Sequence, residues 1–273
     1  MPDALPDLLQ TLALLTGGGL IAGLLAGLLG IGGGIVMVPV LFLIFSLEGA
    51  DFAWRMHLAV ATALAVIVPT SLSSLRAHAR RGSVDRDIAR AWAPMVAFGA
   101  AAGSAVAASI GAEALIAIFA VFAGLMGVKM LLPLDDRRLG ESFPVRGAGR
   151  IAPTVIGCLS ALMGIGGATF SVPYMTLFGM PIHRAVGTAA LIGAIVSGIG
   201  VLGYILGGWG RDFELENTLG FVHWPSVLVV APVSVLAAPL GARIAHALPR
   251  RALSVIFGLF LLATAGRLLA SIL

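Results

Sequence analysis

The sequence is poor in charge and in cysteine. Only 11% of its 273 residues are Asp, Glu, Lys or Arg, and Cys158 is its single cysteine. One cysteine excludes an internal disulfide framework and a metal cluster built on cysteines. A chain with so few charges and 59% hydrophobic residues cannot form a water-soluble surface. The composition therefore predicts a polytopic membrane protein.

Sequence motifs typical of intramembrane hydrolases are also missing. The sequence has no Gly-x-Ser-Gly, no His-Glu-x-x-His and no pair of aspartates within an apolar run. We therefore predict no catalytic residue, no metal site, no cofactor and no enzyme activity. No charged residue falls in the middle of an apolar segment, which gives little support to a proton pump based on a buried carboxylate. The net charge of +4 comes from Lys and Arg in loops, which indicate orientation and contact with membrane lipid rather than with nucleic acid.

Eight hydrophobic segments follow one another along the chain, and most have the ~20 residues that a membrane-spanning helix needs. Two of them, 11–45 and 151–178, are interrupted by glycines and divide into arms of about a dozen residues. Such an arm rises only ~18 Å and reaches the middle of a ~30 Å hydrocarbon core. Each interrupted segment is either a re-entrant hairpin or a single kinked span. The arms are 17–29, 34–45, 151–163 and 168–178, and the other segments are 56–75, 88–110, 112–132, 185–206, 221–242 and 252–273.

The interrupted segments belong to an internal repeat. Gly30-Ile31-Gly32-Gly33-Gly34 followed by Val38-Pro39 returns as Gly164-Ile165-Gly166-Gly167-Ala168 followed by Val172-Pro173. The similarity continues downstream, where Ala93-Pro94 returns as Ala231-Pro232. We therefore predict two transmembrane repeats, 1–133 and 151–273, joined by a cytoplasmic linker at 134–150. Each repeat contains one broken segment and three ordinary helices.

The positions of Lys and Arg favour the hairpin interpretation. Short cytoplasmic loops collect these residues, and their bias toward one side is stronger if each broken segment turns back on itself. A hairpin followed by three crossings inserts the second repeat upside down and places both termini on the periplasmic side. The predicted fold is thus an all-α membrane protein with two inverted repeats, each a re-entrant or broken helical hairpin plus three transmembrane helices. In such folds the broken elements meet near the midplane, and rocking exposes their shared site to each side in turn.

The glycine loops are the candidate substrate-binding residues. Unpaired backbone groups are tolerated in a membrane only where they face protein, a cavity or a ligand. Glycine amides can converge on an anion, and helix N-termini add partial positive charge. Close helix packing by small residues is the alternative interpretation. The candidates are Gly30, Gly32, Gly33, Gly34, Gly164, Gly166 and Gly167.

Hydroxyl and imidazole side chains near the loops complete the candidate site. Thr62 and Thr188 are equivalent in the repeat and would bind either an anion or a backbone carbonyl. Thr169 and Ser171 follow the second loop, and serines such as Ser71 and Ser74 are weaker candidates. Histidine titrates near neutral pH, so the equivalent pair His57 and His183 would serve as a gate or in proton coupling, or would be interfacial residues without a role.

The duplicated Gly-Ile-Gly-Gly with Val-Pro resembles the sulfite exporter TauE/SafE family of membrane permeases. The resemblance covers 17–273 and includes the His-x-Ala-x-Gly-Thr pattern from His183 to Thr188, whereas the first copy has Ala61 in place of Gly187. It implies a secondary transporter for a small sulfur-containing anion, such as sulfite or an organosulfonate, in the bacterial cell inner membrane. An anion channel with a glycine-lined pore is the alternative. The identity of the anion, the direction of transport, the coupling ion and the formation of a homo-oligomer stay open.

Overall fold

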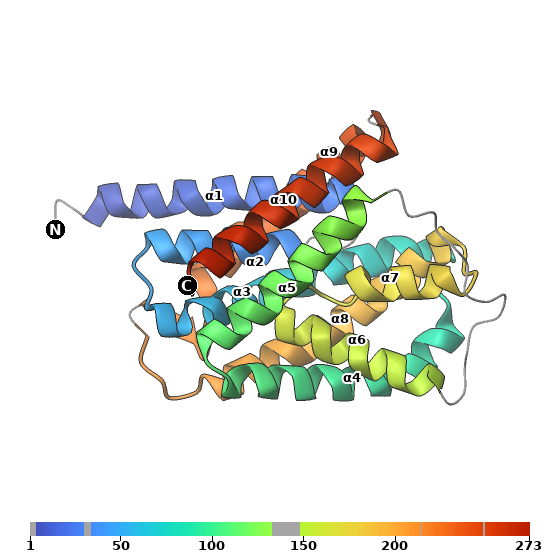
Figure 1. Cartoon of the computed structure of the whole chain (residues 1–273), viewed down its shortest axis with the longest axis horizontal. Helices are drawn as coiled ribbons and strands as arrows, with labels where there is room; N and C mark the ends of the chain where they lie inside the picture. Colours follow the sequence, from blue (N-terminus) through green and yellow to red (C-terminus); the bar gives the residue numbers. More distant parts are fainter. Residues whose placement is uncertain (1–3, 30–33, 133–147, 214, 248) are drawn as a thin grey trace.

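The structure is a bundle of helices that run roughly along one direction (Figure 1). The computed structural model describes residues 4–29, 34–132, 148–213, 215–247 and 249–273. Within these ranges it has one antiparallel pair of two-residue strands, β1 (Thr218–Leu219) and β2 (Val222–His223). Its helices are α1 (Ala4–Leu29), α2 (Gly34–Leu47), α3 (Phe52–Arg80), α4 (Arg86–Ser109), α5 (Ala112–Leu131), α6 (Ala148–Met163), α7 (Ala168–Leu177), α8 (Ile182–Gly207), α9 (Trp224–Ala247) and α10 (Arg250–Ala270).

Six helices in the described part of the chain are long and apolar enough to cross a membrane, namely α3, α4, α5, α8, α9 and α10. The protein is therefore an all-α, multi-pass membrane protein. The predicted linker at 134–150 lies mostly outside the described residues, which resume at Ala148 in α6.

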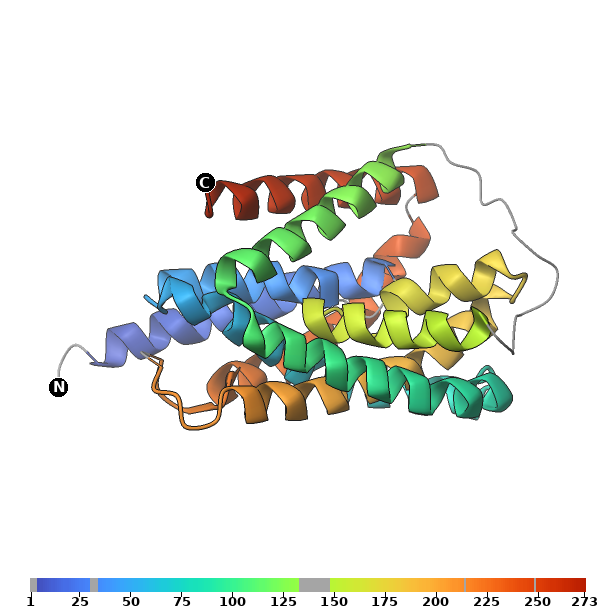
Figure 2. The same ribbon diagram turned by 60° about the horizontal axis from the view of Figure 1, so that its bottom comes forward.

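The two interrupted segments fold back on themselves. Gly18 of α1 faces Val40 and Ile44 of α2, because a Cβ atom added to Gly18 would lie 2.8 Å from both side chains. A straight or kinked helix would hold Gly18 and Ile44 several turns apart. In the second half, α7 returns alongside α6 in both views (Figures 1 and 2).

The first arm is longer than the sequence analysis expects. Helix α1 begins at Ala4 instead of Gly17 and continues through Gly17, Gly18 and Gly19. Glycine weakens a helix, but here it permits close packing. Gly18 contacts α2, and a Cβ added to Gly19 would lie 3.2 Å from Val233 in α9.

Equivalent glycines allow each hairpin to pack closely against a helix of the opposite half. Helix α1 packs on α9, and α6 packs on α4. A Cβ added to Gly241 of α9 would overlap the carbonyl oxygen of Leu24, and one added to Gly103 of α4 would overlap the carbonyl oxygen of Cys158. Gly103 and Gly241 occupy matching positions in the sequence repeat. The two contacts are thus repeated as well.

Helices α3 and α8 pack against each other in the centre of the molecule. Every residue of α3 from Met56 to Ile67 is buried, consistent with an unbroken run of apolar and small residues. The next helix begins where Asp85 caps α4, with its Oδ1 atom accepting the backbone N–H groups of Asp87 and Ile88 at 3.2 Å. These central helices position the candidate site between the two halves.

Candidate functional site

The second glycine loop ends α6 in a Schellman turn. The N–H of Gly164 donates to the carbonyl of Ala161 at 3.3 Å, and that of Ile165 donates to the carbonyl of Ser160 at 3.0 Å. Gly164 and Gly166 both have φ of +69°, a conformation that residues with a Cβ atom rarely adopt. The repeated glycines therefore have a backbone role in the second loop before any ligand is considered.

The start of α2 lies against the second glycine loop. A Cβ atom added to Gly34, the first residue of α2, would overlap the backbone carbonyl of Ile165 in the second loop. From the other side, a Cβ added to Gly164 would lie 2.9 Å from Val38 of α2. The sequence candidates Gly30, Gly32 and Gly33 lie outside the described residues. Gly34 and the second loop are in contact.

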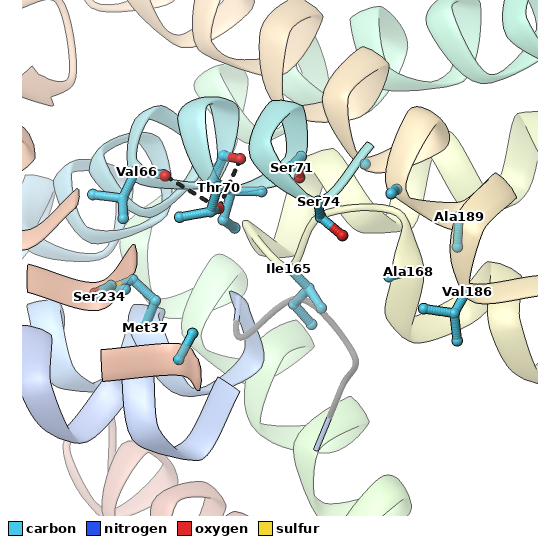
Figure 3. Close-up of a pocket in the computed structure, with 15 residues that line it drawn as sticks. Met37, Val66, Thr70, Ser71, Ser74, Ile165, Ala168, Val186, Ala189 and Ser234 are labelled. Atoms are coloured by element: carbon cyan, nitrogen blue, oxygen red, sulfur yellow. Dashed lines mark hydrogen bonds between the residues drawn. The ribbon is translucent and has the colours of Figure 1, made fainter. Parts of the chain in front are cut away.

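A cavity of about 190 Å³ adjoins the second loop (Figure 3). It lies between the two halves. Its walls come from α2, α3, the second loop, the start of α7, the first half of α8 and the middle of α9. None of the described residues that line it carries a charge. The lining residues on which the argument depends are Thr70, Ser71, Ser74, Gly166, Ala168, Gly193 and Ser234.

The cavity wall contains three hydroxyl side chains from one face of α3. Thr70 donates to the carbonyls of Val66 and Ile67 at 3.4 and 2.9 Å, so its proton is used within the helix. Ser71 and Ser74 make no hydrogen bond with the residues that the structure describes, and Figure 3 places both beside Thr70. These two hydroxyls are available to a ligand.

Backbone amides approach the same space. Helix α7 begins at Ala168 without a side-chain cap, and the amides of Gly166 and Gly167 donate to no described residue. A Cβ atom placed on Gly193 would lie 3.0 Å from Ser71 Oγ and 3.8 Å from the Gly167 nitrogen. A side chain at Gly193 would therefore crowd Ser71, with which Gly193 lines the cavity. Gly166 and Ala168 also line it, so the N-terminus of α7 adjoins the cavity, and its partial positive charge favours an anion.

Thr62 and Thr188 lie outside the cavity wall and make equivalent hydrogen bonds. Thr62 Oγ1 accepts the backbone N–H of His223 at 3.1 Å, and Thr188 Oγ1 accepts that of Asp85 at 2.9 Å. His223 and Asp85 match in the repeat and directly precede α9 and α4. Each threonine therefore fixes the start of a helix in the opposite half.

The two polar residues after the second loop, Thr169 and Ser171, are not among the residues that line the cavity. Ser171 donates to the carbonyl of Gly167 at 2.6 Å, which stabilises the first turn of α7. Thr169 is 4% exposed, and its hydroxyl has no partner among the described residues. Neither residue lines the cavity.

The two histidines have opposite environments. His57 is fully buried, and its Nε2 lies 3.0 and 3.1 Å from the carbonyls of Ala107 and Ile110. Since both partners are acceptors, Nε2 carries the proton. His183 is exposed at the start of α8. The neighbouring Arg184 forms an ion pair with Asp85 at 2.6 Å.

Sequence reasoning passed over several lining residues. Thr70, Gly193 and Ser234 were not candidates, and Ser71 and Ser74 ranked low. The signal that points to α3 is a run of hydroxyl residues directly after Pro69 in an otherwise apolar segment. Gly193 was not predicted because the equivalent residue in the first repeat is Ile67, so this glycine does not belong to the repeated pattern. A search of the described residues finds no group of three His, Cys, Asp or Glu side chains that could hold a metal ion.

Comparison with known proteins identifies the family. The profile described as "Sulfite exporter TauE/SafE" matches residues 15–268. The chain belongs to the sulfite exporter TauE/SafE family. The match includes both glycine breaks and every helix that lines the cavity.

Relatives of this TauE/SafE family member carry transporter names. A probable membrane transporter protein of Haemophilus influenzae is 32% identical over 247 residues, covering 90% of this chain and 94% of its own. The probable membrane transporter protein YunE of Bacillus subtilis is 26% identical, with 89% and 92% covered. A probable membrane transporter of Methanocaldococcus jannaschii is 25% identical, with 94% and 97% covered. No solved structure matches significantly. The family and these names indicate a membrane transporter rather than an enzyme.

Proposed function

We propose that the protein is a secondary transporter that moves a small sulfur-containing anion, such as sulfite or an organosulfonate, through the cavity between its two halves. The observation that carries the proposal is the uncharged cavity that Ser71 and Ser74 of α3 share with Gly166 and Ala168 at the start of α7. The cavity is many times larger than the ~10–15 Å³ that holds one water molecule. Neutral donors and an absence of carboxylates suit an anion that must bind and then leave.

The proposal includes an inverted-repeat mechanism, with repeats 1–133 and 151–273. Its support is the pair of equivalent bonds in which Thr62 and Thr188 each hold a residue of the other half. Repeats that share one site between them can expose it alternately by rocking. In this mechanism the glycine breaks bind the anion, and the ends of α3 and α8 near His57 and His183 act as gates. We place the protein in the bacterial inner membrane with both termini periplasmic.

Charge on the two faces supports this orientation. Arg76, Arg80 and Arg81 lie near the end of α3, on the face where α8 begins with His183 and Arg184. Short loops rich in arginine are typical of the cytoplasmic side. The cavity lies toward this end of α3, because Ser74 and Val186 line it. The proposed cytoplasmic face is therefore the one nearer the cavity.

Flux measurements on purified protein in liposomes test the function. A transporter takes up labelled sulfite with saturation and accelerates its exchange when unlabelled sulfite is on the other side. Uptake should be competed by sulfoacetate or taurine if the class of anion is right. Ion conductance without exchange would instead support the channel alternative, and the absence of any sulfur-anion flux would reject the substrate class.

A further inference from the structure

The sequence repeat assigns a counterpart to each residue of the cavity wall. Ser71 and Ser74 of α3 correspond to Ser197 and Gly200 of α8. In the same way, Ala190 of α8 corresponds to Leu64 of α3. The repeat thus provides two equivalent sets of positions that could line a passage, one at each end of the pair of helices α3 and α8. The first set is Ser71, Ser74 and Ala190, and the second set is Ser197, Gly200 and Leu64.

The second set is closed in this structure. Leu64 and Ser197 are both 0% exposed. A Cβ atom added to Gly200 would lie 2.9 Å from Leu64 Cδ1, so these two residues are in contact across the helices. Their counterparts, Ser74 and Ala190, both line the open cavity. The same pair of positions therefore lines a cavity at one end and is in contact at the other.

The hydroxyls of the closed set have only local partners. Ser197 donates to the carbonyl of Gly193 at 2.7 Å, one turn earlier in the same helix. Ser171, the counterpart of Met37 in the cavity wall, bonds in the same way to Gly167. Such a bond to the preceding turn needs no partner from another helix, and the hydroxyl can rotate to a ligand when space opens. Both residues could thus become polar lining without leaving a backbone group unpaired.

An aromatic cluster seals this end of the molecule. The ring of His57 stacks on Phe221 at 5.0 Å between centroids, and Trp54 lies 5.7 Å from Phe221. The Arg211 guanidinium covers Trp54 at 4.5 Å from the ring centroid. The position equivalent to Phe221 at the other end is Ser83. The ring that stacks on His57 therefore has no aromatic counterpart at the matching position of the other end.

We propose that Ser197, Ser171 and Gly200 line a second half of the transport pathway, which opens past the Trp54 and Phe221 cluster when the cavity beside Ser71 closes. This inference rests on the proposed alternating-access function and identifies the residues exposed in the opposite-facing state. The contact between Leu64 and Gly200 is the barrier that must separate. The anion would then leave the cavity beside Ser71 for the Ser197 hydroxyl.

Thiol labelling from each face of the membrane tests this pathway. In a Cys158→Ser background, the variants Ser71→Cys and Ser197→Cys are treated with a membrane-impermeant maleimide in right-side-out and in inverted vesicles. We expect the Ser71→Cys variant to react from one face only and the Ser197→Cys variant from the opposite face only. Adding Trp54→Ala should raise the labelling rate of the Ser197→Cys variant at least several-fold and lower that of the Ser71→Cys variant. Trp209→Ala, an exposed tryptophan two residues before Arg211, is the matched control and should change neither rate.

Labelling of both variants from the same face would overturn the proposal. A lack of labelling would overturn it too, if the Ser197→Cys and Ser171→Cys variants both stay unreactive from either face even when Trp54→Ala is added. The readout needs no substrate, so it is independent of the identity of the anion. Intact sulfite exchange with failed reciprocal labelling would reject this pathway alone, whereas reciprocal labelling without sulfur-anion flux would reject the substrate alone.

Discussion

Gly34 lies so close to Ile165 that even a methyl group on Gly34 would overlap the Ile165 carbonyl. The two residues belong to different halves of the chain and to the two breaks in the helices. Their contact brings the start of α2 to the loop between α6 and α7. This arrangement explains why a residue without a side chain stands at Gly34, whereas its counterpart in the repeat is Ala168.

Replacing Gly34 by alanine should separate the two breaks. A Cβ atom there would meet main-chain atoms, which cannot rotate away, and overpacking of this kind costs ~1–3 kcal/mol. We expect a lower thermal midpoint in detergent and a loss of sulfite exchange. Gly17→Ala is the control, because a Cβ at Gly17 has no atom within 4 Å. Equal midpoints for the two variants would contradict the close contact.

The Schellman turn after α6 predicts a second sensitive glycine. Gly164→Ala forces a side chain into a left-handed conformation, at a cost of ~1–2 kcal/mol, and brings a Cβ to 2.9 Å from Val38. Gly210 also has a positive φ but has nothing within 4 Å of an added Cβ. The Gly164 variant should therefore unfold at a lower temperature than Gly210→Ala. The reverse order would show that packing around Gly164 is loose.

The free hydroxyls of α3 should contribute to anion affinity. A hydrogen bond to a charged group is worth ~1.5–3 kcal/mol, so Ser71→Ala should weaken sulfite binding roughly 10-fold or more, with Ser74→Ala having an effect of the same sign. Ser73→Ala alters an exposed serine between them and should bind as the wild type does. Calorimetric titration measures the affinity. An unchanged affinity in both cavity variants would remove α3 from the site.

His223 predicts a dependence of stability on pH. Burial lowers the pKa of His223 to about 4, from an ordinary value of 6.5. Between these values the unfolded chain binds a proton that the folded chain excludes, so stability is full above about pH 6.5 and falls as the pH drops toward 4. His223→Asn should reduce the slope of thermal midpoint against pH in this window. Equal slopes in the variant and the wild type would contradict the buried, neutral imidazole.

The sequence predicts the helical elements and the two breaks because these depend on local chemistry. Apolar length identifies α3 and α8, and the duplicated glycines identify the turn after α6, whereas Gly30 to Gly33 of the first copy lie outside the described residues. The predicted start of the first arm at Gly17 was wrong, because α1 begins at Ala4 and continues through the glycines, of which Gly18 and Gly19 pack against other helices. The short strands β1 and β2 were not predicted, since two residues give no periodic signal.

The candidate site was harder to predict than the fold. Thr62 and Thr188 were predicted to bind either an anion or a backbone carbonyl, and in the structure their oxygens accept amides from distant segments. Such contacts between halves depend on tertiary packing and have no signature in a single sequence. Gly193 illustrates the same difficulty, because its importance comes from an empty space next to Ser71 rather than from a group that it contributes.

The most direct test of the central claim, that the cavity beside Gly193 binds the anion, is to fill it. Gly193→Val places a side chain between Ser71 and the Gly167 amide, whereas Gly198→Val in the same helix points to open space. Calorimetric titration of both purified variants with sulfite should show at least a tenfold loss of affinity, or ~1.4 kcal/mol, for Gly193→Val and no change for Gly198→Val. Binding of sulfite to a folded Gly193→Val variant with wild-type affinity would contradict the account.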